Sequence, residues 1–177
     1  LNKDEKAILT TFGKPQVVKD PGLYFRWPWP IQNLVRLDVR KQLYEDMARE
    51  TVTKDNINLI VKLVVTWSID KENPLEFYKK VGENKEDADK QLETLIRSTQ
   101  QNVIRAYSQK DFFSSPQTEI KDEDGRVITI PARQSRLGEI ENTLLQSLNE
   151  VTSQKYGIIV HNVAFVRNSL HEKNSVS

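Results

Sequence analysis

The sequence contains no cysteine, which excludes disulfide bonds, iron–sulfur clusters and thiol chemistry. This absence is compatible with an oxidising compartment, where a lone thiol would be a hazard. Histidine is almost as scarce, with only His161 and His171. A metal site needs three or four converging ligands, and no spacing of histidines and carboxylates supplies them. His161 lies within a predicted strand, so we expect it to have a structural role.

Glycine is sparse as well, with six residues, and none belongs to a phosphate-binding loop, a dinucleotide fingerprint or a nucleophile elbow. The acidic run before Gly125 fits a calcium loop poorly, because it places Ile120 and Pro131 where carboxylates are required. A rival enzyme hypothesis, a hydrolase using dispersed acidic residues, needs carboxylates that converge in a cleft with shifted pKa values. We therefore predict no catalytic, cofactor-binding or metal-binding residue.

The sequence also lacks an excess of positive or negative charge, and it lacks long apolar runs. Lysine and arginine total 26 against 25 acidic residues, so the net charge of +1 predicts no nucleic-acid partner. No run approaches the roughly 18–20 apolar residues of a membrane span. Both ends of the chain are charged or polar and look cut from something longer. We expect the 177-residue chain itself to be soluble.

The most distinctive stretch present is 21–40, PGLYFRWPWPIQNLVRLDVR. A Pro-Gly turn leads into an alternating strand that Pro28 and Pro30 end, because proline cannot donate to a central ladder. A second alternating strand follows from about residue 35. The stretch thus predicts two strands joined by an aromatic corner.

The aromatic corner is the feature that suggests a binding role. Tryptophan and tyrosine favour the membrane–water interface, where a ring is partly buried and its polar edge stays wet. The alternative is that the rings fill the first lobe, which the sequence favours for Phe25 and Trp27, whereas for Trp29 both readings stay open. The predicted membrane-proximal residues are Tyr24, Trp27, Pro28, Trp29 and Pro30.

The rest of the chain predicts a sheet with helices on one face. Apolar residues occupy every second position over 57–69, which predicts one long strand. Asn73 as an N-cap before Pro74 predicts a short helix over 74–81, and helical spacing predicts helices over 88–107 and 138–156, the last one stopped by Gly157. A buried strand is predicted at 158–166, and Asp124-Gly125 predicts a two-residue hairpin turn.

We therefore expect an α+β fold in a single domain over 1–177. An antiparallel, β-rich first lobe over about 1–56 precedes a second lobe over 57–168, a sheet with helices packed on one face. Ser169 and Glu172 stand at capping-box spacing, so 169–177 is expected to be the start of a truncated helix.

The order of elements and the residues themselves resemble the SPFH, or band 7, superfamily of stomatins, prohibitins, flotillins and the HflK/HflC pair. The resemblance runs from AILTTFGKPQVVKDPGLYFRWPWP through VTKDNINLIVKLVVTWSI and LIRSTQQNVIRAY to YGIIVHNVAFVR. It covers nearly the whole chain and is strongest for the HflC branch. The segment 116–136 looks like a branch-specific insertion, so no family property is carried onto it.

This resemblance implies a non-enzymatic, membrane-associated scaffold. The HflC-like branch implies assembly with an HflK-like paralogue into a ring that regulates a membrane-bound ATP-dependent protease. It also implies a bacterial inner-membrane protein, with this domain on the periplasmic side. The alternatives are a stomatin- or prohibitin-like organiser of membrane microdomains, and a peptide- or lipid-binding module that uses the aromatic corner.

The resemblance further implies a membrane anchor before this domain and a coiled coil after it. Once the long helices are assigned to the sheet, the sequence shows no leftover apolar stripe for self-association. We therefore expect this chain alone to be monomeric or weakly self-associating, and the full protein to form a homo- or hetero-oligomer.

Overall fold

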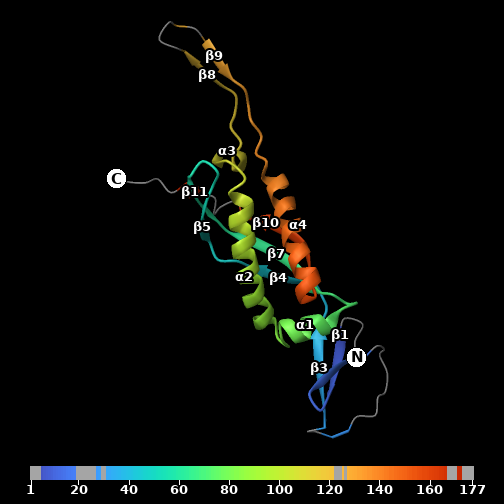
Figure 1. Ribbon diagram of the computed structural model, residues 1–177. Coiled ribbons are helices and arrows are strands. Elements are labelled where there is room, and N and C mark those ends of the chain that lie inside the picture. The colour runs from blue at the N-terminus through green and yellow to red at the C-terminus, as the bar shows by residue number, and fades with distance from the viewer. Residues whose placement is uncertain are drawn as a thin grey trace.

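Alternating apolar residues build small antiparallel sheets around one shared core in the computed structural model (Figure 1). The structure describes residues 5–18, 27–28, 31–121, 125, 127–166 and 171–172. The buried cluster runs without interruption from Ile8 and Leu37 near the N-terminus to Phe165 near the C-terminus. The molecule is elongated, with a sheet at one end and a two-stranded arm at the other.

The first sheet holds three antiparallel strands in the order β2-β1-β3. Their bounds are β1 Glu5–Thr11, β2 Lys14–Val18 and β3 Gln32–Asp38. Ala7 and Ile8 of β1 are fully buried, which ties this sheet to the core. The alternating strand expected between the Pro-Gly turn and Pro28 cannot be compared with the structure, because residues 19–26 lie outside the described residues.

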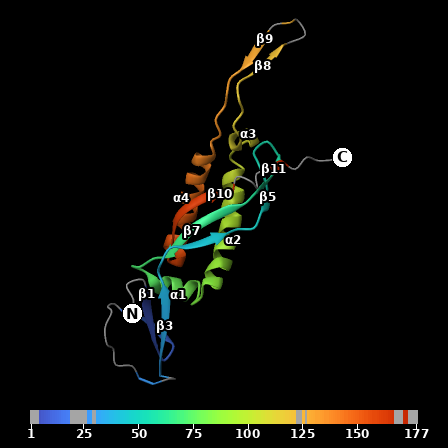
Figure 2. The same ribbon diagram turned by 180° about the vertical axis from the view of Figure 1, so that it is seen from behind.

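The central sheet has the order β10-β7-β4, all antiparallel. Its strands are β4 Gln42–Glu45, β7 Leu63–Ile69 and β10 Ile158–Phe165. Helices α2 and α4 cover one face, and Figure 2 shows the sheet from behind, with the strands in front of these helices. The expected α+β fold, with helices on one face of the sheet, is confirmed.

The predicted single strand over 57–69 is wrong in one respect. It divides into β6 Asn58–Val61 and β7, which belong to different sheets. At Lys62 the pairing partners change, and the carbonyl of Lys62 accepts a bond from the Val166 N–H at 2.9 Å. Alternation nevertheless continues across the break, because Val61 and Leu63 are both fully buried.

Strand β6 pairs with β5 Arg49–Val52 and with β11 His171–Glu172. The expected helix after Ser169 is therefore wrong at His171–Glu172, which form a strand; Ser169 and 173–177 lie outside the described residues. Strands β4 and β5 were expected in the first lobe, but they pair with β7 and β6 of the second. The border between the lobes thus lies nearer residue 40 than 56.

The helices follow the predicted spacing. They are α1 Pro74–Lys80, α2 Lys85–Ile104, α3 Gln109–Phe112 and α4 Leu137–Tyr156. The short helix α3, closed by a capping box between Ser108 and Asp111, was not predicted. Gly157 ends α4 in the left-handed conformation, as expected from its position.

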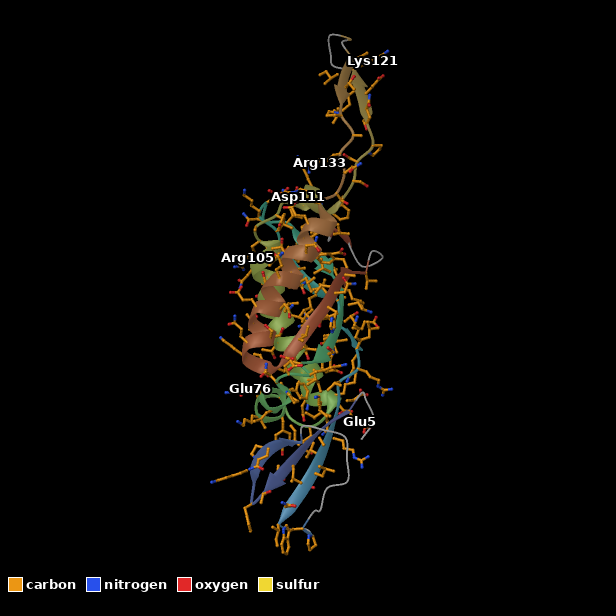
Figure 3. All side chains as sticks on the ribbon, turned by 90° about the vertical axis from the view of Figure 1, so that its right-hand side faces the viewer. Glu5, Glu76, Arg105, Asp111, Lys121 and Arg133 are labelled. Carbon is orange, nitrogen blue, oxygen red and sulfur yellow. The ribbon has the colours of Figure 1, made fainter. Side chains whose placement is uncertain are left out.

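The arm consists of β8 Thr118–Lys121 and β9 Val127–Ile130. The predicted hairpin is confirmed by the antiparallel pairing that runs up to Lys121 and Val127; of the residues between them, 122–124 and 126 lie outside the described residues. An isolated β-bridge between Ser115 and Arg133 joins the two segments of the chain at the base of the arm. Figure 3 shows Arg133 at this base and Lys121 towards the far end.

Candidate functional site: an exposed aromatic tip

The first sheet ends in an exposed aromatic tip, which we define as Phe12, Trp27 and Pro28. The side chain of Phe12 is 80% exposed and that of Trp27 is 67% exposed. The first sheet and the β8–β9 arm lie at the two opposite ends of the molecule (Figure 1). Two large aromatic side chains therefore face solvent at one extremity of an elongated molecule.

The turn between β1 and β2 holds Phe12 in a strained conformation. Thr11 pairs with Lys14, so Phe12 and Gly13 alone form the loop. Their φ angles are +50° and +76°, as a type I′ turn requires. Asparagine or glycine suits the first position of such a turn, whereas a bulky residue is disfavoured there. The conformation of the turn therefore does not account for a phenylalanine at this position.

Hydrogen bonds fix the Trp27 backbone to the same sheet. The Trp27 N–H donates to Gln32 Oε1 at 3.0 Å, and Gln32 Nε2 donates to Thr11 Oγ1 at 3.2 Å. The Ile31 N–H donates to the Pro28 carbonyl at 3.2 Å, which closes a turn before β3. The exposed Trp27 ring is therefore attached to a backbone that hydrogen bonds hold in place.

The structure tests part of the predicted aromatic corner. Trp27 and Pro28 are exposed, so the interpretation of Trp27 as a core residue is wrong. Tyr24, Phe25, Trp29 and Pro30 lie outside the described residues. A position at the membrane surface stays a prediction for all five predicted residues.

Sequence reasoning missed Phe12, whose side chain is the most exposed large apolar one among the residues that the structure describes. The apolar run AILTTF over 7–12 is typical of a short strand, which would make Phe12 its last residue. A signal was present, because Phe12 directly precedes Gly13-Lys14-Pro15 and so occupies a turn position.

A polar hollow of about 300 Å³ lies between the first sheet and the body. Gln42 and Trp67 stand opposite each other in the β4–β7 register and both line it. Gln42 Oε1 and Trp67 Nε1 are buried and have no hydrogen-bond partner within the described part of the chain. One buried acceptor and one buried donor at the same place can together hold a bridging water or a small polar group.

A partly buried ion-pair network ties the β4–β5 connection to α2. Asp46 is 1% exposed and accepts bonds from Arg49, which also donates to Glu93 at 2.8 Å. Tyr44 donates to Asp46 Oδ1 at 3.3 Å. Hydrogen bonds to Asp46 and Glu93 raise the pKa of Arg49, and burial followed by the Asp46 charge raises the pKa of Tyr44. Both side chains keep their ordinary charge, so the network is structural.

Two carboxyl groups on separate elements have a lowered pKa. Hydrogen bonds from Arg40 lower the pKa of Asp38 on β3, and hydrogen bonds from Arg136 lower that of Glu139 on α4. Both shifts favour the charged form, so neither group is prepared to donate a proton at neutral pH. Across the described ranges, no group of three or more histidine or acidic residues is placed to hold a metal ion.

His161 occupies a bulge in β10, where the register shifts between Val160 and Asn162. Its Nε2 lies 2.8 Å from Oγ of Ser68 on the neighbouring strand. Burial and, less strongly, the Lys41 charge lower the pKa of His161. This hydrogen bond across the sheet agrees with the structural role expected for His161.

Comparisons with known proteins show which family the chain is similar to. The family model for the SPFH domain / Band 7 family matches residues 1–174. Protein HflC of Buchnera aphidicola is 33% identical over 76 residues, which cover 39% of this chain and 24% of that protein. An uncharacterized protein of Archaeoglobus fulgidus is 32% identical over 65 residues, covering 37% of this chain and 26% of the relative. The aligned part of the chain therefore spans about a quarter of the length of these relatives.

Among the helices that the structure describes, none is long and apolar enough to cross a membrane. The match to the family model covers every element described above, from β1 to β11. The resemblance seen in the sequence is thereby confirmed, and the chain belongs to the SPFH domain / Band 7 family.

Proposed function

We propose that this chain is the SPFH domain of a non-enzymatic membrane scaffold, with its aromatic tip against the bilayer surface. The observation that carries the proposal is the pair of exposed rings, Phe12 and Trp27, at one end of the molecule. A tryptophan ring is well suited to the membrane–water interface, and an exposed phenylalanine beside it adds apolar area. Tyr24, Trp29 and Pro30, which the sequence predicts to be membrane-proximal, are included in this proposal.

The similarity to an HflC protein supports a more specific role. We infer that the full protein assembles with an HflK-like paralogue into a ring that regulates a membrane-bound ATP-dependent protease. A bacterial relative supports an inner-membrane location, and the absence of cysteine is compatible with the periplasmic side.

Binding of the chain to liposomes tests the tip. Each interfacial ring contributes on the order of 1 kcal/mol, so the Phe12→Ser, Trp27→Ser double variant should partition roughly 30-fold less strongly. Phe113→Ser is the matched control, because Phe113 is also an exposed phenylalanine, 36% exposed, but lies near the base of the arm. Equal partitioning of wild type and double variant, with folding intact, would remove the tip from the proposal.

The assembly requires a separate experiment. The full protein and its paralogue, co-expressed in membranes, should purify as a ring that retains the protease and changes its rate of substrate degradation. Rings that form without the protease would favour an organiser of membrane microdomains instead.

A further inference from the structure

The β8–β9 arm carries an apolar face that nothing in the described part of the chain covers. In the arm's register Ile120 stands opposite Ile128, and Thr118 stands opposite Ile130. Residues directly opposite share a face, so the three isoleucines line one side of the arm. They are 50%, 52% and 44% exposed for Ile120, Ile128 and Ile130. An exposed apolar stripe, which was not expected from the sequence, is therefore present on the arm.

The outer edges of the arm are also unpaired. β8 and β9 form a sheet of two strands, and the described residues supply no third strand. An isolated two-stranded ribbon is only marginally stable in water, and open edges are templates for pairing with another chain. Figure 1 shows the arm projecting away from the body, where another chain can reach it.

The charges on β8 favour pairing with a second copy of the same strand. Glu119 and Lys121 flank Ile120, and neither has a partner within the described part of the chain. Two antiparallel β8 strands centred on Ile120 would place each Glu119 opposite Lys121 of the other copy. Opposite charges directly across a pair of strands stabilise it. Strand β9, with the sequence VITI, has no charge that could select a partner.

We propose that β8 is a self-pairing edge, through which two copies of this chain form a four-stranded antiparallel sheet in the order β9-β8-β8-β9. A two-fold axis passes through the Ile120 pair, and the six isoleucines lie on one continuous face. Because the two β8 strands run in opposite directions, the two bodies lie at opposite ends of this sheet. The contact joins subunits end to end, so it differs from the side-by-side contacts of a ring and does not rest on the proposed function.

The size of the edge sets the strength of this contact. Each copy contributes a strand of only four residues. The surface that such a strand can bury is well below the roughly 800 Å² per partner that stable complexes bury. The association is therefore weak, and dimers form with increasing protein concentration. This agrees with the sequence-based expectation of weak self-association.

Charge reversal tests the pairing by sedimentation of the 177-residue chain over a range of concentrations. Glu119→Lys and Lys121→Glu each create two like-charge pairs per dimer, so each should raise the dimer dissociation constant about tenfold. The double variant with both changes restores opposite charges across the axis and should dimerise like wild type. Glu150→Lys, on the exposed surface of α4, is the control and should change nothing. A double variant as weak as the single variants would overturn the proposal, and so would single variants that match wild type.

Engineered cysteines test the register, because the natural chain contains none. Ile120→Cys should form a disulfide-linked dimer under mild oxidation at a concentration where wild type dimerises. Under the same conditions, Thr129→Cys on β9 should form at least tenfold less disulfide-linked dimer than Ile120→Cys. Preferential cross-linking through Thr129→Cys, equal cross-linking by both variants, or cross-linking by neither would each overturn pairing through β8.

Discussion

The outer edges of β10 and β8 differ in whether other parts of the protein bond their backbone groups. At β10, side chains of α4 accept the outward backbone donors: the Val160 N–H bonds Asn149 Oδ1 at 3.2 Å, and the Phe165 N–H bonds Glu141 Oε1 at 2.9 Å. At β8, no described side chain or strand fills this role. We call the first the capped edge and the second the open edge. The more apolar strand, β10, is the capped one, so its neighbours and not its composition prevent further pairing.

The largest effect is expected from Gly157→Ala, which disrupts the link between α4 and the capped edge. Gly157 has a φ of +62°, and an added Cβ would lie 2.8 Å from Phe77 N and 2.9 Å from Asn73 O. Backbone strain and this clash together should lower the free energy of unfolding by about 3 kcal/mol, measured by urea denaturation.

Gly13→Ala is the control for that measurement. Gly13 has a similar φ of +76° but no atom within 4 Å of an added Cβ. It should cost about 1 kcal/mol, the strain alone. Equal losses for the two variants would show that the clash at Gly157 relaxes without cost.

The next effect concerns the cap itself. Glu141→Ala removes the acceptor of the half-buried Phe165 N–H, which should cost about 1–3 kcal/mol and speed hydrogen exchange at that amide. Glu141→Gln keeps an acceptor oxygen and should retain most of the stability. Glu150→Ala, exposed on the same helix, should stay within about 0.5 kcal/mol of wild type. Unchanged exchange at Phe165 in Glu141→Ala would mean that the cap is dispensable.

Removal of the open edge should affect the stability of the body less. Replacing 117–131 by a short Gly-Ser linker deletes the exposed strands of the arm. The free energy of unfolding should change by less than about 0.5 kcal/mol, because these side chains contribute little to the core. Sedimentation should show the loss of self-association. A large loss of stability would show instead that the arm supports the body.

The smallest effect is a pH dependence at the bulge of β10. The pKa of His161 is lowered from its ordinary value of 6.5, so the folded state resists protonation more than the unfolded state. Its contribution to stability is full above 6.5 and is lost as the pH falls below that value through the folded pKa. His161→Gln should flatten the pH dependence of urea denaturation in this window. An unchanged slope would assign the acid sensitivity to other groups.

The sequence predicted elements better than it predicted partnerships between them. Alternation over 57–69 identified most of the buried positions, although Ser68 is buried against the pattern, and helical spacing located α2 and α4. Alternation reports which side of a strand is buried, but not which strand lies beside it. The change of sheet at Lys62 and the place of β4 and β5 in the second lobe were therefore missed.

The two surface features were hidden for a similar reason. Phe12 follows an apolar run and Ile120 lies in a strand, and in both cases sequence alone does not say which apolar residues stay exposed. The capped edge was equally hidden, because the bonds from Asn149 and Glu141 depend on how α4 lies against β10. Prediction succeeded where the signal was local and failed where tertiary contacts decide.

The capped edge also has a consequence for the order of events during synthesis. Only Gly157 separates α4 from β10, so the helix leaves the ribosome immediately before the strand that it caps. Strand β7, the other neighbour of β10, is made about 90 residues earlier. When β10 emerges, both of its neighbours already exist in the nascent chain. Strand β10 is thus the last strand of the central sheet to be made, and it can be covered on both sides as soon as it appears.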